Sequence, residues 1–215
     1  MNMNRWLFLS ITLIGLALLV PAMAADKMPM EEKMAEPMNM QRAIFAGGCF
    51  WCMEYPFEKL DGVSEVISGY TGGQKENPTY KEVSAGETGH TEAVEVHYDP
   101  TRVSYEQLLN AFWMSMDPTD ADGQFVDRGT QYRPGIYPLN EEQMKLAVAS
   151  REKLDQSGRF DEPIATEIVP AGEFYPAEKY HQDYYKKNPI RYKYYRYGSG
   201  RDQFLDKVWG KDRDH

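Results

Sequence analysis

The chain has 215 residues, of which 42% are hydrophobic and 13% aromatic, so it can bury one substantial core but is short for two. Its formal net charge is -9, from 33 acidic and 24 basic side chains. No cluster of lysine and arginine offsets this excess of acid, which argues against a nucleic-acid partner.

The first residues have the pattern of a signal peptide. Arg5 precedes an apolar run over residues 6–20, and Ala22 and Ala24 place small side chains where a signal peptidase cuts. The run is short for a membrane span, which needs about 20 residues. We therefore expect cleavage of residues 1–24 and export to the periplasm, whereas an uncleaved segment would anchor the chain in a membrane.

Residues 25–40 form a methionine-rich leader that we expect to be disordered. The stretch from Asp26 to Met40 holds five methionines and two prolines without a sustained period. Methionines outside the cytosol could bind copper(I) or act as a sink for oxidants, although a plain linker explains the composition more simply. Residues 41–215 are then expected to form a single catalytic domain.

Both cysteines follow the first predicted element of that domain. Residues 43–46 predict a buried strand, and the Gly47–Gly48 pair predicts a tight turn. From 50 to 60 apolar residues recur at helical spacing, with Pro56 expected to kink or shorten the helix. Cys49 is thus expected at a strand-to-helix turn, where exposed N–H groups favour the reactive thiolate.

The spacing of the cysteine pair indicates a reactive role. A disulfide between Cys49 and Cys52 closes a loop of two residues and gains little stability from loop closure. If Cys49 is oxidised to a sulfenic acid, Cys52 is placed one turn away to resolve it as a disulfide. A zinc site is the weaker interpretation, because His90 and His97 fall on opposite faces of a predicted strand. We expect no metal.

The remaining elements interleave strands and helices irregularly. Strands are predicted at 63–68, 91–98 and 164–169, helices at 104–116, 140–158 and 204–209, and loops at 69–80 and 117–136. The starts of the first two helices carry the capping patterns Ser104 with Gln107 and Asn140 with Gln143. This order favours an α+β fold, a two-layer sandwich with a mixed central sheet.

Glu92 is the most informative residue after the cysteines. By alternation it shares a strand face with Val94, Val96 and Tyr98, where a carboxylate is costly unless it is paired or protonated. Burial would raise its pKa into the range of a general acid near neutral pH. If this end of the strand is exposed to solvent, Glu92 is simply a hydrated carboxylate and has no role as a general acid.

Five further residues are candidates for the site. Neighbouring helical residues point about 100° apart, so at least one of Phe50 and Trp51 is expected to line the site as an apolar wall. Tyr80, Asp127 and Tyr132 lie in loops rich in glycine and proline, where such side chains often serve a site. With 15 tyrosines in the chain, this argument singles out none of them.

Several motifs together resemble the type A peptide methionine sulfoxide reductases. They run in matching order from about Arg42 to Asn188 and are GCFWCMEYPFEKLDGV, SGYTGG, NPTY, GHTEAV, DRGTQYRPGIY and YHQDYYKKNP. The resemblance implies a two-layer α+β domain related to the ferredoxin-like arrangement. It implies reduction of methionine-S-sulfoxide, free or in oxidised proteins, by a monomer without a cofactor. An external thioredoxin-like dithiol would supply the electrons.

The resemblance also implies roles by position. Cys49 resembles the nucleophile that attacks the sulfoxide sulfur, and Phe50 and Trp51 match the apolar wall that receives the methyl group. Glu92, in GHTE, matches the acid that protonates the departing oxygen. These roles suit the chemistry, because a sulfoxide sulfur is a poor electrophile until its oxygen is protonated or strongly hydrogen-bonded.

Other matched positions complete the site and set the recycling route. Tyr80, in NPTY, and Tyr132, in TQYR, match phenols that hydrogen-bond the oxygen, and Asp127 matches a site carboxylate. Many members end in a tail with resolving cysteines, which residues 190–215 lack, while Cys52 occupies a position that is often glycine. This implies recycling through a Cys49–Cys52 disulfide, and the short gap predicts a local rearrangement on oxidation.

Two other functions are open from the residues alone. A thioredoxin-like C-x-x-C exchanger would reduce protein disulfides without depending on Glu92. A metal-binding module, for copper above all, would use the cysteines and the methionine-rich leader. Neither explains why NPTY, GHTE and TQYR occur together.

Overall fold

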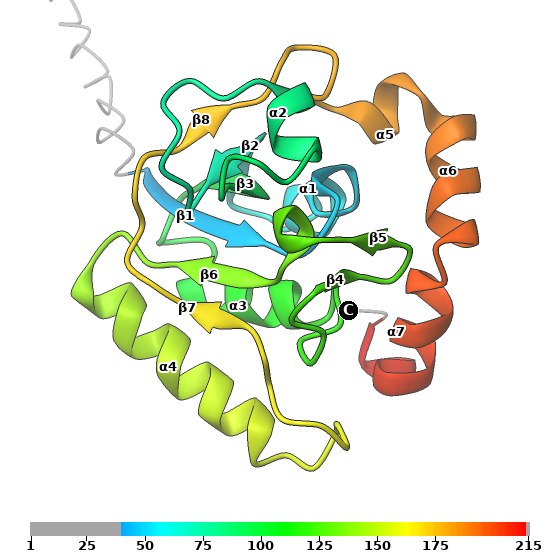
Figure 1. Cartoon of the computed structure of the whole chain (residues 1–215). Coiled ribbons are helices and arrows are strands. Elements are labelled where there is room, and N and C mark those ends of the chain that lie inside the picture. The colour runs from blue at the N-terminus through cyan, green and yellow to red at the C-terminus, as the bar shows by residue number, and fades with distance from the viewer. Residues whose placement is uncertain (1–39, 214–215) are drawn as a thin grey trace, which may run out of the picture. The chain divides into compact units, whose positions relative to one another are not determined.

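The computed structural model describes residues 40–213, so the predicted signal peptide and nearly all of the leader lie outside the described residues. A six-stranded sheet in the order β7-β6-β1-β3-β2-β8 forms the centre (Figure 1). Its strands are β1 (Gln41–Ala46), β2 (Val63–Thr71), β3 (Thr91–Tyr98), β6 (Gly135–Tyr137), β7 (Glu167–Ile168) and β8 (Tyr175–Pro176). The β6–β7 pair is parallel and the other pairs are antiparallel, so the sheet is mixed, as predicted.

Helices and short turns connect and cover the sheet. The α-helices are α1 (Glu54–Glu58), α2 (Tyr80–Ser84), α3 (Tyr105–Trp113), α4 (Glu141–Asp155), α5 (Tyr184–Lys187), α6 (Pro189–Gly198) and α7 (Arg201–Trp209). The 3-10 turns are η1 (Phe50–Cys52), η2 (Thr130–Tyr132) and η3 (Gly210–Arg213), and a small hairpin joins β4 (Gly123–Gln124) to β5 (Asp127–Arg128). Within residues 40–213, no helix has the length and apolar character needed to span a bilayer.

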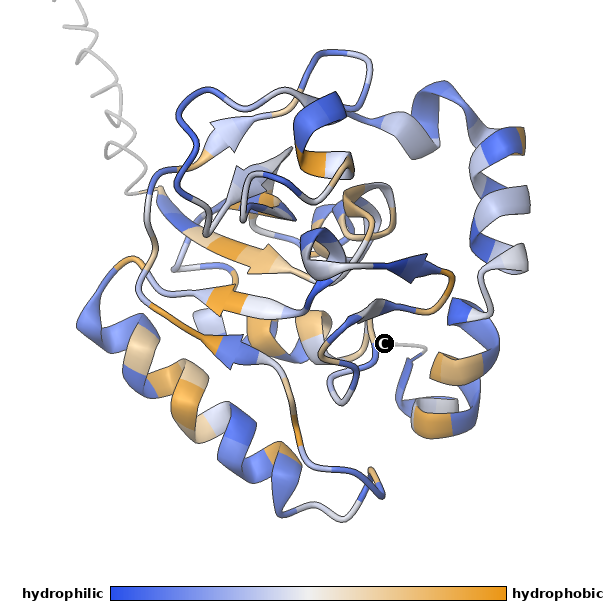
Figure 2. Cartoon of the chain, viewed as in Figure 1, coloured by the Kyte–Doolittle hydropathy of each residue, from blue (hydrophilic) through white to orange (hydrophobic). Residues whose placement is uncertain are grey.

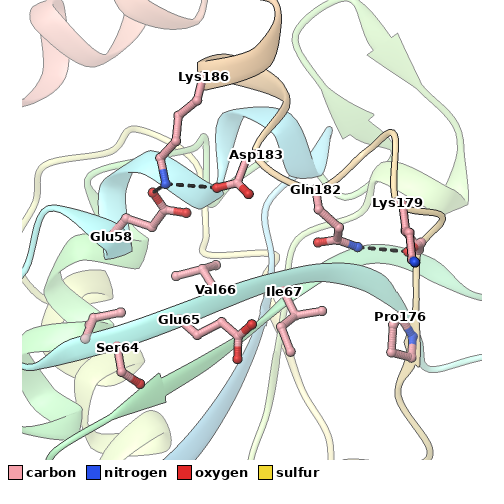
Figure 3. Close-up of a pocket in the computed structure, with 12 residues that line it drawn as sticks. Glu58, Ser64, Glu65, Val66, Ile67, Pro176, Lys179, Gln182, Asp183 and Lys186 are labelled. Atoms are coloured by element: carbon pink, nitrogen blue, oxygen red, sulfur yellow. Dashed lines mark hydrogen bonds and ion pairs between the residues drawn. The ribbon is translucent and has the colours of Figure 1, made fainter.

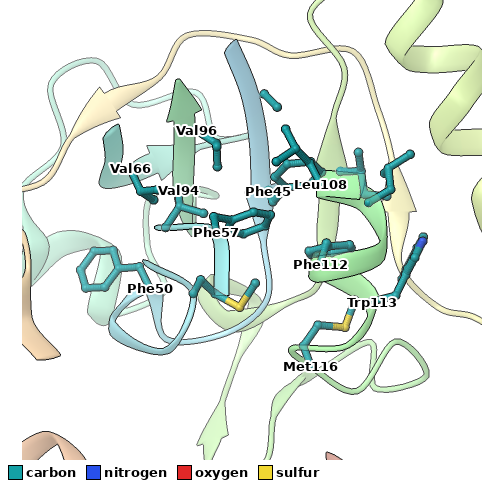
Figure 4. Packing of buried hydrophobic residues seen from close by; sticks show 14 of the residues in the cluster. Phe45, Phe50, Phe57, Val66, Val94, Val96, Leu108, Phe112, Trp113 and Met116 are labelled. Carbon is teal, nitrogen blue, oxygen red and sulfur yellow. The ribbon is translucent and has the colours of Figure 1, made fainter. Parts of the chain in front are cut away.

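The main core lies between the sheet and the α1–α3 layer. Phe45 of β1 stacks on Phe57 of α1 and Phe112 of α3, with ring centroids 5.0 and 5.2 Å apart, and Val94 and Val96 of β3 complete this face (Figure 4). β1 begins with hydrophilic residues and continues with hydrophobic ones (Figure 2), and this later part is the part that is buried.

The opposite face of the sheet is covered by a connecting segment and not by a helix. Ile44, Ala93 and Tyr137 point to this face and pack with Ala171 and Phe174, which lie between β7 and β8. The protein is therefore a two-layer α+β domain, as predicted.

Both predicted helix starts are confirmed by their caps. The Ser104 hydroxyl accepts a hydrogen bond from the Gln107 N–H, and the Gln107 side chain accepts one from the Ser104 N–H. Asn140 accepts a hydrogen bond from the Gln143 N–H at 2.9 Å. Each cap satisfies a backbone donor that the first turn of a helix leaves free.

Several predicted boundaries were wrong. The 50–60 helix is split into η1 and α1, and Pro56 lies in the first turn of α1, where the missing N–H costs nothing. The 63–68 strand extends to Thr71, and Tyr80 begins a helix. The 117–136 loop contains β4, β5, η2 and the start of β6. β6 pairs with β1, and β4 pairs with β5, so the hydrogen bonds of these strands come from partners that the local pattern does not show. The 164–169 strand shrinks to two residues, and the tyrosine-rich tail folds into α5, α6 and α7.

Candidate active site

Cys49 stands at the end of the turn that leaves β1. Gly48 has a φ of +83°, which favours glycine, and a Cβ at Gly47 would lie 2.7 Å from the Met53 sulfur, so the Met53 side chain would have to move. The Cys49 carbonyl accepts a hydrogen bond from the Cys52 N–H at 2.9 Å, which closes η1. The predicted strand-to-helix turn is confirmed, but only a single 3-10 turn follows it.

Glu92 is buried beside this turn. Its side chain is on β3 with 1% exposure, and its Oε2 accepts a hydrogen bond from the Phe50 N–H at 3.1 Å. Burial raises the pKa of Glu92 to about 8, against the lowering effect of that hydrogen bond, and the charge of Asp127 adds to the rise. The predicted buried, proton-carrying carboxyl on the apolar face of the strand is present.

The thiol of Cys49 is held in its neutral form. Burial raises the pKa of Cys49 well above the ordinary value, and the charges of Glu92, Cys52 and Asp127 raise it further, while a hydrogen bond with Tyr195 lowers it. The expectation that a helix N-terminus would favour the thiolate was wrong for the free site. One 3-10 turn has little dipole, and burial outweighs it.

The two aromatic residues between the cysteines take different places. Phe50 is buried, with its ring centroid 6.4 Å from that of Tyr80 and 4.9 Å from that of His181. Trp51 stacks on Tyr184 at 3.7 Å and donates its indole N–H to Nδ1 of His181 at 3.1 Å. Together they give the site an aromatic wall that α5 and the residues before it hold in place.

The three loop candidates converge on the same place. Tyr80 opens α2, Tyr132 ends η2 and Asp127 lies in β5. Burial, followed by the charge of Glu92, raises the pKa of Tyr80 to about 12, and the same two causes raise the pKa of Tyr132 above its ordinary value. Cys49 and Asp127 contribute to both shifts, so both phenols lie within electrostatic reach of the thiol and keep their protons.

Sequence reasoning missed residues from the C-terminal third of the chain. The Tyr195 hydroxyl donates to the Asp127 carboxylate, and Tyr195 also reaches the Cys49 thiol. His181 is 1% exposed, with its Nε2 unpartnered among the described residues. The motif YHQDYYKKNP contained His181, but no local pattern distinguishes Tyr195 from the other tyrosines of the tail.

Glu54 was also missed. It is fully buried, and one carboxylate oxygen accepts hydrogen bonds from the Ser68 hydroxyl at 2.9 Å and the Asp183 N–H at 3.0 Å. Burial raises the pKa of Glu54 to about 7. This carboxyl ties α1 to β2 and to the turn that precedes α5.

Cys52 follows Cys49 by three positions but belongs to a different cluster of buried side chains. Both cysteines are free, and Cys52 packs with Tyr184 and Tyr192, while Cys49 belongs to the main core. The local rearrangement that we expect when Cys49 and Cys52 form a disulfide stays a prediction.

The domain also has a pocket that lies apart from the predicted site residues. It lies along β2 and is lined by both apolar and charged side chains, and Lys186 is paired to Glu58 at 2.6 Å and to Asp183 at 2.9 Å (Figure 3). None of the predicted site residues lines it. Across residues 40–213, no three His, Cys, Asp or Glu side chains are grouped so as to hold a metal ion.

The comparison with known protein families decides the identity of this domain. A family model described as peptide methionine sulfoxide reductase matches residues 41–213. The chain belongs to this family. A methionine sulfoxide reductase MsrA of Bacillus licheniformis is 55% identical over 181 residues, covering 84% of this chain and 99% of the relative. An MsrA/MsrB protein of Vibrio cholerae is 56% identical over 176 residues, and the chain spans about half of that relative, 47% of its length.

Solved structures agree with this assignment. The methionine sulfoxide reductase A of Corynebacterium diphtheriae is 39% identical with a TM-score of 0.63, covering 72% of this chain and 77% of the other. Reduced Mxr1 of Saccharomyces cerevisiae is 32% identical with a TM-score of 0.67, covering 72% and 88%. The protein is therefore a type A peptide methionine sulfoxide reductase, an oxidoreductase that reduces methionine sulfoxide with thiols, and the resemblance seen in the sequence is confirmed.

Proposed function

We propose that this reductase converts methionine-S-sulfoxide to methionine with Cys49 as the nucleophile and Glu92 as the proton donor. The observation that carries the assignment is the buried carboxyl of Glu92, which holds a proton at neutral pH within electrostatic reach of the Cys49 thiol. A proton donor of this kind is what a sulfoxide oxygen needs in order to leave as water.

The first half-reaction uses the groups around Cys49. The O–H groups of Tyr80 and Tyr132 and the carboxyl of Glu92 hydrogen-bond the sulfoxide oxygen, while the methyl group rests on the wall of Phe50 and Trp51. The carboxyl of Glu92 and the thiol of Cys49 each give a proton to the sulfoxide oxygen as the Cys49 sulfur attacks the sulfoxide sulfur. The sulfur–oxygen bond breaks, water leaves, and Cys49 is bonded to a positively charged methionine sulfur. A water molecule then attacks the Cys49 sulfur, the bond between the two sulfurs breaks, methionine leaves, and Cys49 becomes a sulfenic acid while the released proton returns to Glu92. Asp127, which accepts a hydrogen bond from Tyr195, helps to hold the tail against the site.

The second half-reaction resets the enzyme. Cys52 attacks the sulfenic acid, releases water and leaves a Cys49–Cys52 disulfide. An external dithiol of the thioredoxin kind then reduces that disulfide, so one sulfoxide and one dithiol give methionine, one disulfide and water. The two thiols and the external dithiol supply all the electrons of the reaction, so no prosthetic group is needed.

The substrates are proposed to be oxidised methionines in exported proteins. This rests on the predicted signal peptide, residues 1–24, and export would require a thioredoxin-like donor in the same compartment. The reductase is proposed to act as a monomer, because all of the proposed catalytic groups come from one chain.

A single-turnover experiment tests the assignment. Reduced protein is mixed with a peptide that contains methionine-S-sulfoxide, and methionine formed and thiols lost are counted for wild type, Cys49→Ser, Cys52→Ser and Glu92→Gln. We expect two thiols lost per methionine in wild type, about one equivalent of methionine from Cys52→Ser, none from Cys49→Ser, and slow formation in Glu92→Gln.

The matched control is Glu95→Gln. Glu95 lies on the same strand but on its other face, where it pairs with Arg42 and His97. Glu95→Gln should therefore form methionine at the wild-type rate. Reduction of a protein disulfide without any methionine would favour the thiol-exchange alternative and contradict the proposal.

A further inference from the structure

Glu178 is an acidic residue that neither half-reaction uses, and its carboxylate joins two elements of the site. It lies in the segment between β8 and α5. Its Oε1 accepts a hydrogen bond from the backbone N–H of Tyr80 at 2.9 Å, and its Oε2 accepts one from the Tyr70 hydroxyl at 2.8 Å. One side chain thus holds the first residue of α2 against β2.

Tyr70 is a fixed point of the central sheet. Its side chain is fully buried on β2, and its ring centroid lies 6.1 Å from that of Phe50. In the register of β2 and β3, Tyr70 is directly opposite Glu92. Residues opposite each other on antiparallel strands point to the same face of a sheet. A group that is bound to Tyr70 is therefore fixed relative to the proposed proton donor.

The helix that carries Tyr80 is short and has few ties to the rest of the domain. α2 has five residues, and a helix of this length has little stability of its own. Within the described part of the chain, two side chains from outside residues 72–86 hydrogen-bond to its backbone. Glu178 binds the Tyr80 N–H at its start, and the Gln131 amide donates to the Ser84 carbonyl at 3.1 Å at its end. The start of α2, where Tyr80 lies, thus depends on Glu178.

The same segment also places a ring against the phenol of Tyr80. The Glu178 carbonyl accepts a hydrogen bond from the His181 N–H at 2.8 Å, which closes a turn. This turn brings the imidazole of His181 to within 4.2 Å of the Tyr80 ring, measured between centroids. The backbone of Tyr80 and its ring are therefore both held from residues 178–181.

Glu178 has the charge that two donors require. Burial raises its pKa, but the hydrogen bonds from the backbone N–H groups of Tyr80 and Glu178 and from the Tyr70 hydroxyl lower it below the ordinary value. An ionised carboxylate accepts hydrogen bonds at both oxygens, so it can hold the Tyr80 N–H and the Tyr70 hydroxyl at the same time.

We propose that Glu178 is the positioning residue that sets the place of the Tyr80 phenol at the sulfoxide oxygen. The inference rests on the proposed function, in which Tyr80 donates a hydrogen bond to that oxygen. Glu178 acts through the backbone of Tyr80 and does not touch the substrate, so it is not a catalytic residue. A donor stabilises the developing charge only at the correct distance, so loss of this contact should slow methionine formation.

A double-mutant cycle with Tyr80 tests this proposal. Methionine formation in a single turnover is measured for wild type, Glu178→Ala, Tyr80→Phe and the double variant. We expect Glu178→Ala to slow methionine formation about fivefold in wild type. In the Tyr80→Phe background the same change should cost less than about twofold, because the phenol that Glu178 positions is already absent. A merely structural role would slow both backgrounds by the same factor.

Two further variants separate the position of Tyr80 from the charge of Glu178. The amide oxygen of Glu178→Gln can still accept the Tyr80 N–H, and its NH2 group can donate to the Tyr70 oxygen, so this variant should react at nearly the wild-type rate. A rate as low as that of Glu178→Ala would overturn the proposal. The matched control is Glu173→Ala, a change in an exposed acid of the same segment whose backbone carbonyl, and not its side chain, binds the Thr71 hydroxyl of β2. It should form methionine at the wild-type rate.

Glu178→Asp covers the case in which Glu178→Ala does not fold. It keeps the charge, but its side chain is one methylene shorter and cannot keep both hydrogen bonds. It should also slow methionine formation, and again much less in Tyr80→Phe. Equal effects in the two backgrounds, or none in either, would overturn this inference alone. If wild type forms no methionine, or if Tyr80→Phe reacts as fast as wild type, the proposed function is wrong in that respect and the inference falls with it.

Discussion

Replacement of Glu92 by glutamine should make the enzyme slower and, at the same time, more stable. Glutamine has nearly the shape of the protonated carboxyl and can still accept the Phe50 N–H through its amide oxygen. It cannot deliver a proton, so methionine formation should fall by about a hundredfold or more. The gain in stability comes from the buried ionisation that glutamine avoids.

The size of that gain follows from the pKa of the carboxyl. The folded-state pKa of Glu92 is about 8, above its ordinary value of 4.5. Between these two pH values the folded protein binds a proton that the unfolded chain releases, so the stability of wild type falls as pH rises through this window. At 1.36 kcal/mol for each pKa unit, the cost of Glu92 is about 3 kcal/mol at pH 7 and about 5 kcal/mol at pH 9.

Urea denaturation of reduced wild type and Glu92→Gln from pH 5 to 9 measures this cost. The difference in the free energy of unfolding should be small near pH 5, rise with pH, and level off above pH 8. Glu95→Gln, on the other face of the strand, should show no such rise. If the wild-type and Glu92→Gln curves stay parallel over this range, Glu92 does not ionise with a raised pKa, and its assignment as the proton donor loses its basis.

Three further predictions concern the two phenols, the pH dependence of the first half-reaction and the buried Glu54. Tyr80→Phe and Tyr132→Phe should each slow methionine formation about tenfold or more, because each phenol donates a hydrogen bond to the developing charge on oxygen. The double variant should form methionine more slowly still. Unchanged single-turnover rates would show that the phenols do not contact that oxygen. Methionine formation in wild type should fall above pH 8, as the carboxyl of Glu92 loses its proton, and a rate that rises steadily to pH 10 would contradict this. Glu54→Ala should lower the free energy of unfolding by about 2–4 kcal/mol, because it leaves the Ser68 hydroxyl and the Asp183 N–H without their acceptor. Urea denaturation measures this change. A loss below about 1 kcal/mol would show that water takes the place of the carboxylate as acceptor.

The sequence predicts those site residues whose role is indicated by the pattern of their immediate neighbours. Cys49 follows two glycines at the end of an apolar strand, and Glu92 interrupts the apolar face of an alternating strand. Both signals are contained in a few neighbouring residues, and the structure places both residues as these signals indicate. The caps at Ser104 and Asn140 were predicted for the same reason.

The part that the sequence does not predict depends on contacts between distant segments. Tyr195 reaches Asp127 across 68 positions, and Arg201 reaches Gly47 across 154. No periodicity connects such residues, so a tail rich in tyrosine and arginine gives no sign of which side chain turns inward. The short β6 was missed because pairing with β1, and not its own three residues, makes it a strand.

The position of α5, α6 and α7 has a consequence for the order in which the enzyme matures. These helices supply Tyr184, Tyr192, Arg196 and Arg201, the groups that enclose Cys52 and support the turn at Gly47. During synthesis the cysteines emerge first and stay unshielded until nearly the whole chain is available to fold. A nascent or shortened chain would carry both thiols without the enclosure that controls them. The two thiols are therefore enclosed as in the active enzyme only after the C-terminal helices have been synthesised and folded.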